Sequence, residues 1–556
     1  MPSIIKTLIA LVIIITFNAC QYAPYIKYHT NVKGGFPKFS EWDRFVGDNN
    51  NPLRSYDIKK YVLDLDVSPE KKYIYGRVTI GLQTTAVQDT LMFDLSKKLK
   101  LKKVFINGEP TRFSRKKDVV FLLPSSAIPE RKWLDIDFDY EGVPVNIMGE
   151  GPIQWKKDSL DRPHISTQTE GVGPHLLFPC NQLLKDEADV VNINITVPKG
   201  LKVVANGKLV DHQNLGNKER FSHSVTNSMN IYNISFNIGH FEKITYPYTD
   251  IYGQKREIEF HVLDYNLKRA KPFYKQSIAV MGALEELYGS FPWWNDGCKF
   301  VESTFAAMEH QSGIALGIDY DHVEGYNQTL IHELAHEWWG NAITGEDYCD
   351  AWIHEGLATY SEAIVMEKLV SENFYKVTAN YAFPNFIANK IPIHKECGVL
   401  YNSWVNGSDQ DIYLKGAALM HSLRMVMNND QRFFETLKRM LLDWKVKNVS
   451  TSEFIEKFNQ YAGDNYTFVF ISYLESATPP TLHYEVSDSG VMKYRWKQTP
   501  IFPNDGIHLK VGENKVHLYP SEEIQELNLS VDQLIQWQIS ESFYFQPQPT
   551  KFKDDN

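Results

Sequence analysis

The chain has 556 residues, of which 43% are hydrophobic and 13% aromatic, and its net charge is −10 at pH 7. One hydrophobic core rarely organises so many residues, so two to four domains are expected, and the apolar content excludes a disordered chain. The acidic balance and the lack of a basic tract argue against nucleic acid as a partner.

The first twenty residues, MPSIIKTLIALVIIITFNAC, have the pattern of an export signal. Lys6 precedes an apolar run from Leu8 to Phe17, and this run is too short to span a bilayer comfortably. The pattern therefore predicts a signal peptide over residues 1–20. An uncleaved anchor is the alternative.

Cys20 stands three positions after the end of the apolar run, which resembles the lipoprotein signal of bacteria. In that case cleavage would leave Cys20 as a lipid-modified N-terminus, although Phe17 and Asn18 depart from the usual residues of the signal. A plain signal peptide is the other interpretation. We expect an exported protein, lipid-anchored at the periplasmic or outer-membrane face of the cell envelope, with residues 21–55 as a tether.

Residues 56–245 carry alternating or β-branched segments punctuated by Gly, Pro and Asn, and this pattern predicts an antiparallel β-domain. The clearest segments are YDIKKYVLDLDV, YGRVTIGLQTT, KWLDIDFDYEG and DVVNINITVPKG.

Residues 246–475 change to helical spacing of the apolar residues, which predicts a mostly α-helical domain. A Pro-Pro pair at 479–480 then marks a linker, and short strand-like segments follow it. We therefore expect a small β-sandwich over residues 476–545, so the fold class is multidomain α+β.

The segment HELAHEWWG begins at His332. His332 and His336 are four residues apart, so on a helix both rings project from one face and can reach one metal ion. Glu333 lies at the edge of that face, where it can contact a water molecule on the metal without becoming a ligand. Alone, this motif is modest evidence, because two surface histidines would give the same pattern.

A catalytic zinc site needs a third protein ligand and one open position. Glu355 follows His336 by 19 positions and stands near the start of a second amphipathic helix, in the segment DAWIHEGLATYSEA. The alternative is a glutamate without a metal, whose negative charge is stabilised by the helix dipole near the helix N-terminus. The complete spacing favours a metal site.

These segments resemble the M1 aminopeptidase family of gluzincins, and the resemblance covers about residues 56–475. It implies a thermolysin-like catalytic domain, one Zn²⁺ per chain bound by His332, His336 and Glu355, and Glu333 as general base. It also implies peptide substrates with a free N-terminus.

The segment TFAAMEHQSG stands where the family has its exopeptidase motif. By resemblance Ala306 and Ala307 belong to an edge strand that pairs with the substrate backbone, and Glu309 holds the substrate's α-ammonium group. His310 replaces the family's Asn, so the sequence does not determine which hydrogen bonds support the motif. The alternative is an acidic residue at a surface strand end.

A third match is STQTEGVGPHLLFPCN in the β-domain. The resemblance makes Glu170 a second anionic contact for the substrate amine, and it places Gln168 at the border of the first side-chain pocket. A turn glutamate without function is the alternative.

The fourth match is DIYLKGAALMHSLR. By resemblance Tyr413 donates a hydrogen bond to the developing oxyanion, and Lys415-Gly416-Ala417 follow it in register. A buried structural tyrosine is the alternative.

Relatives in this family often carry a large helical C-terminal cap, and we expect a short form without it. Preferences for peptide length and N-terminal residue, and the oligomeric state, stay open. Two further functions compete: an epoxide hydrolase of the leukotriene-hydrolase type, and an inactive peptide-binding lipoprotein. None of the four cysteines after Cys20 forms a CxxC pair, and their pairing is undetermined: Cys180, Cys298, Cys349 and Cys397.

Overall fold

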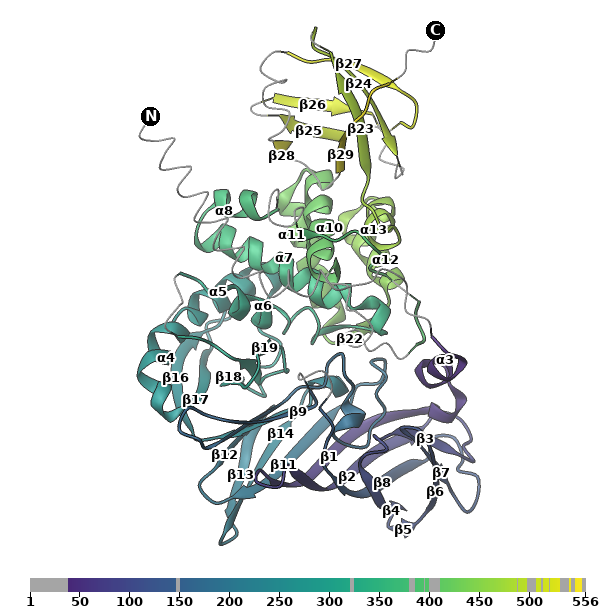
Figure 1. Ribbon diagram of the computed structural model, residues 1–556, viewed down its shortest axis with the longest axis vertical. Helices are drawn as coiled ribbons and strands as arrows, with labels where there is room; N and C mark the ends of the chain where they lie inside the picture. The colour runs from purple at the N-terminus through teal and green to yellow at the C-terminus, as the bar shows by residue number, and fades with distance from the viewer. Residues whose placement is uncertain are drawn as a thin grey trace.

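The computed structural model stacks three parts along its long axis: a strand-rich domain, a layer of helices and a small group of strands (Figure 1). It describes residues 39–146, 151–320, 325–379, 386–394, 396–399, 411–487, 489–497, 507–511, 514–519, 521–530, 540–541 and 546–552. The predicted signal peptide and Cys20 lie outside the described residues.

The N-terminal domain is built on an eight-stranded sheet with the order β13-β14-β11-β1-β2-β8-β4-β5. Alternate residues of its central strand, Leu63, Leu65 and Val67 among them, are buried, as the sequence pattern predicts. The sheet is antiparallel except between β1 and β11, which pair in parallel with Leu63 opposite Ile193. The strands are β1 Tyr56–Ser68, β2 Tyr73–Thr84, β4 Lys100–Ile106, β5 Glu109–Pro110, β8 Trp133–Gly142, β11 Val190–Pro198, β13 Lys208–Asn214 and β14 Lys218–Val225.

Two smaller sheets complete this domain, with the orders β12-β15-β10-β9 and β3-β7-β6. Their strands are β3 Leu91–Asp94, β6 Arg112–Lys116, β7 Val119–Leu123, β9 Ile153–Lys157, β10 Pro163–Thr167, β12 Lys202–Ala205 and β15 Phe236–Gly239, with short 3₁₀ turns at Pro174–Leu176 and Ile231–Asn233.

The expected tether over 21–55 is wrong for its second half. Helix α3 (Glu41–Gly47) begins with a capping box in which Ser40 and Asp43 satisfy each other's backbone N–H groups. Its Val46 is buried in a cluster with Met92 and Val119, so hydrophobic packing fixes this helix on the N-terminal domain.

The middle domain, which the sequence predicted to be catalytic, contains a five-stranded sheet with the order β16-β17-β18-β20-β19. It starts at Phe241, five residues before the predicted boundary, because β16 continues without a linker from the preceding domain. The strands are β16 Phe241–Thr249, β17 Lys255–Leu263, β18 Cys298–Glu302, β19 Ala307–Met308 and β20 Ile314–Leu316, and β21 Ile343–Gly345 pairs separately with β22 Lys447–Val449.

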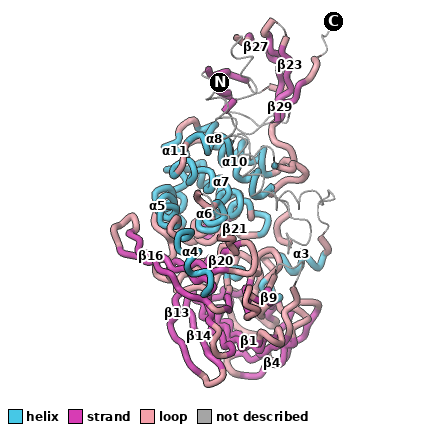
Figure 2. Tube along the Cα trace, turned by 60° about the vertical axis from the view of Figure 1, so that its left-hand side comes forward, coloured by secondary structure: helices cyan, strands magenta, loops and turns pink. Residues whose placement is uncertain are grey.

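The helices of this domain gather on one face of the sheet, between the strands at either end of the molecule (Figure 2). Their apolar residues form one large core with the helix-facing side of the sheet. They are α4 Leu267–Tyr274, α5 Ser277–Tyr288, α6 Gln328–Ala335, α7 Trp352–Leu369, α8 Glu372–Val377, α10 Asp411–Met427, α11 Asp430–Trp444, α12 Thr451–Ala462 and α13 Thr467–Leu474, with 3₁₀ turns at Asp264–Asn266 and Tyr348–Asp350.

The C-terminal part confirms the predicted strands after the Pro-Pro pair. It has two sheets, with the orders β27-β24-β23-β29 and β26-β25-β28, and its core includes Leu482, Met492 and Trp496. The strands are β23 Thr481–Val486, β24 Val491–Lys497, β25 Ile507–Val511, β26 Asn514–Leu518, β27 Gln525–Asn528, β28 Ser540–Glu541 and β29 Gln546–Pro549. Among the residues that the structure describes, no helix has the length and apolar content needed to cross a bilayer.

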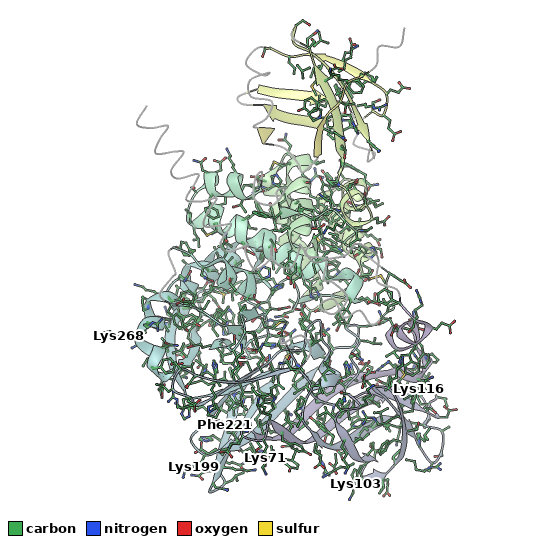
Figure 3. All side chains as sticks on the ribbon, in the orientation of Figure 1. Lys71, Lys103, Lys116, Lys199, Phe221 and Lys268 are labelled. Atoms are coloured by element: carbon green, nitrogen blue, oxygen red, sulfur yellow. A yellow bond between two sulfur atoms is a disulfide. The ribbon has the colours of Figure 1, made fainter. Side chains whose placement is uncertain are left out.

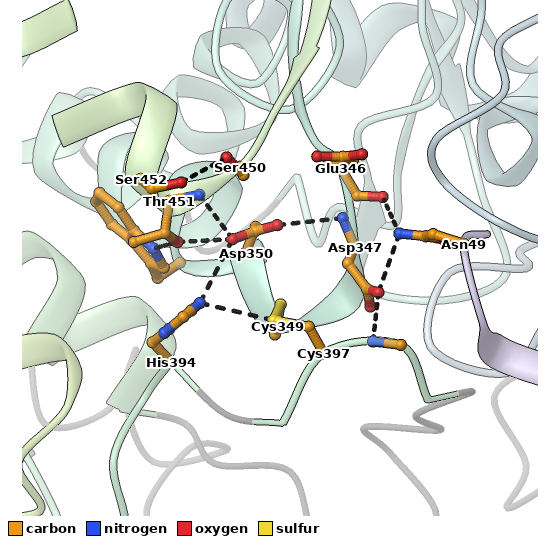
Figure 4. The surroundings of a disulfide bond; sticks show 12 residues. Asn49, Glu346, Asp347, Cys349, Asp350, His394, Cys397, Ser450, Thr451 and Ser452 are labelled. Carbon is orange, nitrogen blue, oxygen red and sulfur yellow. Dashed lines mark hydrogen bonds and ion pairs between the residues drawn. A yellow bond between two sulfur atoms is a disulfide. The ribbon is translucent and has the colours of Figure 1, made fainter. Parts of the chain in front are cut away.

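The cysteine pairing that the sequence left open is settled by proximity. Cys349 and Cys397 form a disulfide, whereas Cys180 and Cys298 are buried free thiols. The bond ties the segment around Cys397 to the turn that precedes α7, and the backbone N–H of Gly398 donates to Asp347 at 2.7 Å (Figure 4).

Candidate metal centre and active site

His332 of α6, His336 at the C-cap of the same helix and Glu355 of α7 converge on a point. His332 Nε2 lies 3.3 Å from Glu355 Oε2, His336 Nε2 lies 3.4 Å from the same oxygen, and the two Nε2 atoms are 3.0 Å apart. Ligands of a tetrahedral zinc ion, each about 2.0–2.1 Å from the metal, are separated by roughly 3.3 Å. The three ligand atoms therefore fit one tetrahedral metal ion.

The other ring nitrogens fix the orientation of both histidines. His332 Nδ1 is 2.8 Å from Glu362 Oε1, and His336 Nδ1 is 2.9 Å from the carbonyl oxygen of Trp339. With Nδ1–H donating to these acceptors, each Nε2 keeps a lone pair for a metal. The sequence reasoning missed Glu362, although its position seven residues after Glu355 puts both on one face of α7 and was a usable signal.

Glu333 lies beside these ligands and has a buried carboxyl oxygen, Oε2, without a hydrogen-bond partner. Burial raises the pKa of Glu333 to about 8, while the neighbouring histidines act in the opposite direction. A divalent cation at the three ligand atoms would act in the same direction as the histidines and lower the pKa of Glu333. The lower pKa favours the ionised form that a general base needs.

Two glycines bring the third ligand and the predicted oxyanion donor together. Helices α7 and α10 cross so closely that a Cβ atom on Gly356 would lie 2.8 Å from the Cα of Gly416. Gly356 follows Glu355, and Gly416 lies three residues after Tyr413, so backbone contact at this crossing positions both side chains. The Tyr413 ring stacks on His332 with centroids 6.0 Å apart.

Glu309 directly follows β19, the edge strand of the five-stranded sheet. Its side chain is buried, the Tyr232 hydroxyl donates to its Oε1 at 3.3 Å, and Asn341 Nδ2 donates to its backbone carbonyl at 2.8 Å. Ala307 lies in β19 at the edge of the sheet, as predicted, and Ala306, which is exposed, directly precedes this strand; pairing with a substrate backbone stays a prediction.

Glu170 reaches this region from the N-terminal domain. Ligand atoms of Glu170, Glu309 and His354 lie within 4.8 Å of one another, and so do those of Glu309, Glu333 and His336. Burial, followed by the charge of Glu309, raises the pKa of Glu170 well above its usual value. The fold thus adds two carboxylates, from two domains, beside the metal ligands.

Gln168 and His310 are buried polar residues near this pair. Gln168 Oε1 has no hydrogen-bond partner, and neither ring nitrogen of His310 has one. Burial lowers the pKa of His310 to about 3, so its ring is neutral. His310 gives Glu309 no support, which Tyr232 and Asn341 supply instead. The structure places all the predicted site residues in one region; their individual roles stay predictions.

The family model described as "Peptidase family M1 domain" matches residues 318–473, which include the three ligand residues and Tyr413. The segment that holds the converging residues is therefore similar to the peptidase domain of family M1.

Curated relatives agree with this assignment. The chain is 22% identical over 459 residues to the leucyl aminopeptidase of Saccharolobus solfataricus, covering 78% of this chain and 55% of that protein. It is 22% identical over 444 residues to the leukotriene A-4 hydrolase of Xenopus laevis, covering 74% of this chain and 69% of that protein. The chain spans about half the length of the aminopeptidases that it matches.

Solved structures share the fold. An M1 zinc metallopeptidase from Deinococcus radiodurans superposes with a TM-score of 0.66 at 18% identity, covering 76% of this chain and 94% of that one. Yeast LTA4 hydrolase gives a TM-score of 0.64 at 17% identity, covering 76% and 68%. About three quarters of this chain thus share the fold of these two proteins.

Proposed function

We propose that this protein is a zinc-dependent aminopeptidase that removes N-terminal residues from peptides. The pair Glu170 and Glu309 beside Glu333 carries the proposal, because a substrate α-ammonium group between these two carboxyl groups would favour their ionised form and be held by it. An ammonium held there places the first peptide carbonyl near the metal ligands and so limits cleavage to the first bond. The aminopeptidase names of several relatives support the same activity.

One Zn²⁺ per chain would be held by His332, His336 and Glu355. When bound, zinc supplies Lewis acidity, which polarises the substrate carbonyl and lowers the pKa of water toward neutrality.

The protein's own groups perform the proton transfers and hold the substrate. Glu333 takes the proton of the attacking water and delivers it to the leaving amine. The Tyr413 hydroxyl donates to the oxygen of the attacked carbonyl as negative charge develops on it. The sheet edge at β19, together with the preceding Ala306, pairs with the substrate backbone and aligns the bond.

Fluorogenic aminoacyl substrates test the activity, and the matched N-acetylated substrates are the control. We expect cleavage only with a free amine, because acetylation removes the charge that Glu170 and Glu309 would bind. Activity should disappear with a chelator and return with one equivalent of zinc. A zinc-loaded protein that cleaves none of the twenty aminoacyl substrates would be an inactive peptide-binding protein instead.

Epoxide hydrolysis is the weaker alternative. The similarity to leukotriene A-4 hydrolase is its only support, and two carboxylates at the site favour a cationic substrate over an epoxide. Turnover of a lipid epoxide in the absence of aminopeptidase activity would reverse this ranking.

We also propose that the protein is exported and anchored by a lipid on Cys20. The apolar run before Cys20 supports export, and the disulfide between Cys349 and Cys397 suits an oxidising compartment. Radiolabelled palmitate should enter the wild-type protein but not C20S. Equal labelling of both would contradict the anchor.

A further inference from the structure

A second cavity lies between the catalytic sheet and the N-terminal domain, away from the metal ligands. Its volume is about 1060 Å³, and none of the predicted active-site residues lines it. One wall comes from β16, β17 and β18, and the other from β12, β13 and β14, which includes Phe221, labelled in Figure 3. A space of this size accommodates an organic molecule or a cluster of waters and ions.

The lining is rich in cations, although the whole chain is acidic. Three carboxylates contribute, and Asp296 among them already accepts hydrogen bonds from Thr226 and Asn227. Three of the basic residues form ion pairs: Lys243 with Glu259, Lys202 with Glu242, and Arg256 with Asp250. Six basic residues nevertheless face three carboxylates in the lining, and they are Lys202, Lys208, Lys243, Lys255, Arg256 and Lys299.

Lys299 is the unusual member of this set. Strand alternation on β18 directs Cys298 and Phe300 into the helix-facing core, so Lys299 faces the N-terminal domain. Its side chain is only 6% exposed, and its Nζ has no hydrogen-bond partner. An ammonium group is costly to bury unpaired, and burial lowers the pKa of Lys299 to about 8.

His223 lines the opposite wall of the cavity and also has a ring nitrogen without a hydrogen-bond partner. It is 4% exposed, and its Nδ1 has no hydrogen-bond partner. Burial, followed by the charges of Lys299 and His261, lowers the pKa of His223 well below its usual value. Two buried donor-bearing side chains from two domains thus lie near one another in a cavity with excess positive charge.

We propose that this cavity binds a small molecule carrying a phosphate-class oxyanion, with Lys299 and His223 as its buried donors. A multivalent anion would supply the missing hydrogen-bond acceptors and offset the charge of Lys299. Lysine ammonium groups bind phosphate as point charges, and the exposed lysines at the mouth would draw the anion in. Phe221, Phe241 and Trp294 offer apolar contact to the rest of such a ligand.

Calorimetric titration of the full-length, zinc-loaded protein with pyrophosphate, at constant ionic strength set by chloride, tests the proposal. We expect saturable 1:1 binding that K299M weakens at least tenfold. The matched control is K268M, which removes an exposed lysine on α4 that does not line the cavity (Figure 3). Aminopeptidase activity and zinc content should be the same in all three proteins, because the cavity is separate from the metal site.

The variants also separate a ligand site from a merely structural lysine. K299M should raise the melting temperature of the ligand-free protein, since it removes an unpaired buried charge, and it should abolish the increase that pyrophosphate causes in wild type. H223L provides a second variant with the same expected loss of binding. Absence of saturable pyrophosphate binding, or binding that K299M and H223L leave unchanged, overturns the proposal.

Discussion

Two buried polar regions of the molecule differ in the sign of the charges that predominate. At the β19 edge of the five-stranded sheet, carboxylates predominate around the point where His332, His336 and Glu355 converge, and Glu333 Oε2 has no hydrogen-bond partner. At the β16–β18 end of the same sheet, basic residues predominate, and Lys299 Nζ and His223 Nδ1 have no hydrogen-bond partner.

The difference shows that each buried cluster of charged groups needs a ligand of the opposite charge to stabilise it. The first region lacks cations, and a zinc ion together with a substrate ammonium group would supply them. The second region lacks an anion. Each of the following experiments removes one group from one region, beginning with the largest expected effect.

E333Q should lower kcat about 10²–10⁴-fold, because the amide cannot take a proton from water. Zinc content should stay at one equivalent, since Glu333 is not one of the three converging ligands. Steady-state kinetics with an aminoacyl substrate and metal analysis of the same sample check both statements. Loss of zinc together with activity would instead make Glu333 a ligand.

Y413F should lower kcat about 10²–10³-fold, equivalent to about 3–4 kcal/mol of transition-state stabilisation, and leave KM nearly unchanged. The hydroxyl contacts charge that exists only as the reaction proceeds. Y252F, which changes a tyrosine that is 67% exposed, is the control. An equal rise in KM with unchanged kcat would mean that Tyr413 binds the ground state.

K299M should change how stability depends on pH. The pKa of Lys299 is about 8 in the folded protein and 10.5 in the unfolded chain, so the unfolded chain binds more protons between these values. The free energy of unfolding of the wild type therefore rises by about 3 kcal/mol between pH 8 and pH 10.5. Below pH 8 the destabilisation caused by burying the charged Lys299 is present in full.

Replacement by methionine removes this contribution. Denaturant unfolding at pH 7.5 and pH 10.5 should show K299M more stable than wild type at the lower pH, with the difference shrinking at the higher pH. K268M is the control and should follow wild type at both. A constant difference between K299M and wild type would mean that Lys299 is not buried as a charge.

E362Q should weaken zinc binding about 10–100-fold, because His332 loses the carboxylate that orients its ring and raises its basicity. Competition with a chelator measures the change. Activity at saturating zinc should stay close to wild type. Unchanged zinc affinity would mean that ring packing alone orients His332, for instance the stacking with Tyr413.

The sequence by itself determined the features that depend on local periodicity. Residues four apart on a helix share a face, so His332 and His336 had to lie side by side, and strand alternation placed Leu63, Leu65 and Val67 in the core. Glu355 could be assigned because the complete spacing resembles a known family, and the same resemblance marked Glu170, Glu309 and Tyr413.

Only the tertiary structure decided how segments distant in the chain meet. It placed Glu170 beside Glu309 from separate domains, joined Cys349 to Cys397, and turned half of the expected tether into a helix packed on the N-terminal domain. It also created the cavity around Lys299. The reason is physical: local patterns depend on neighbouring residues along the chain, whereas these contacts depend on how sheets and helices pack across hundreds of residues, for which no short segment carries a signal.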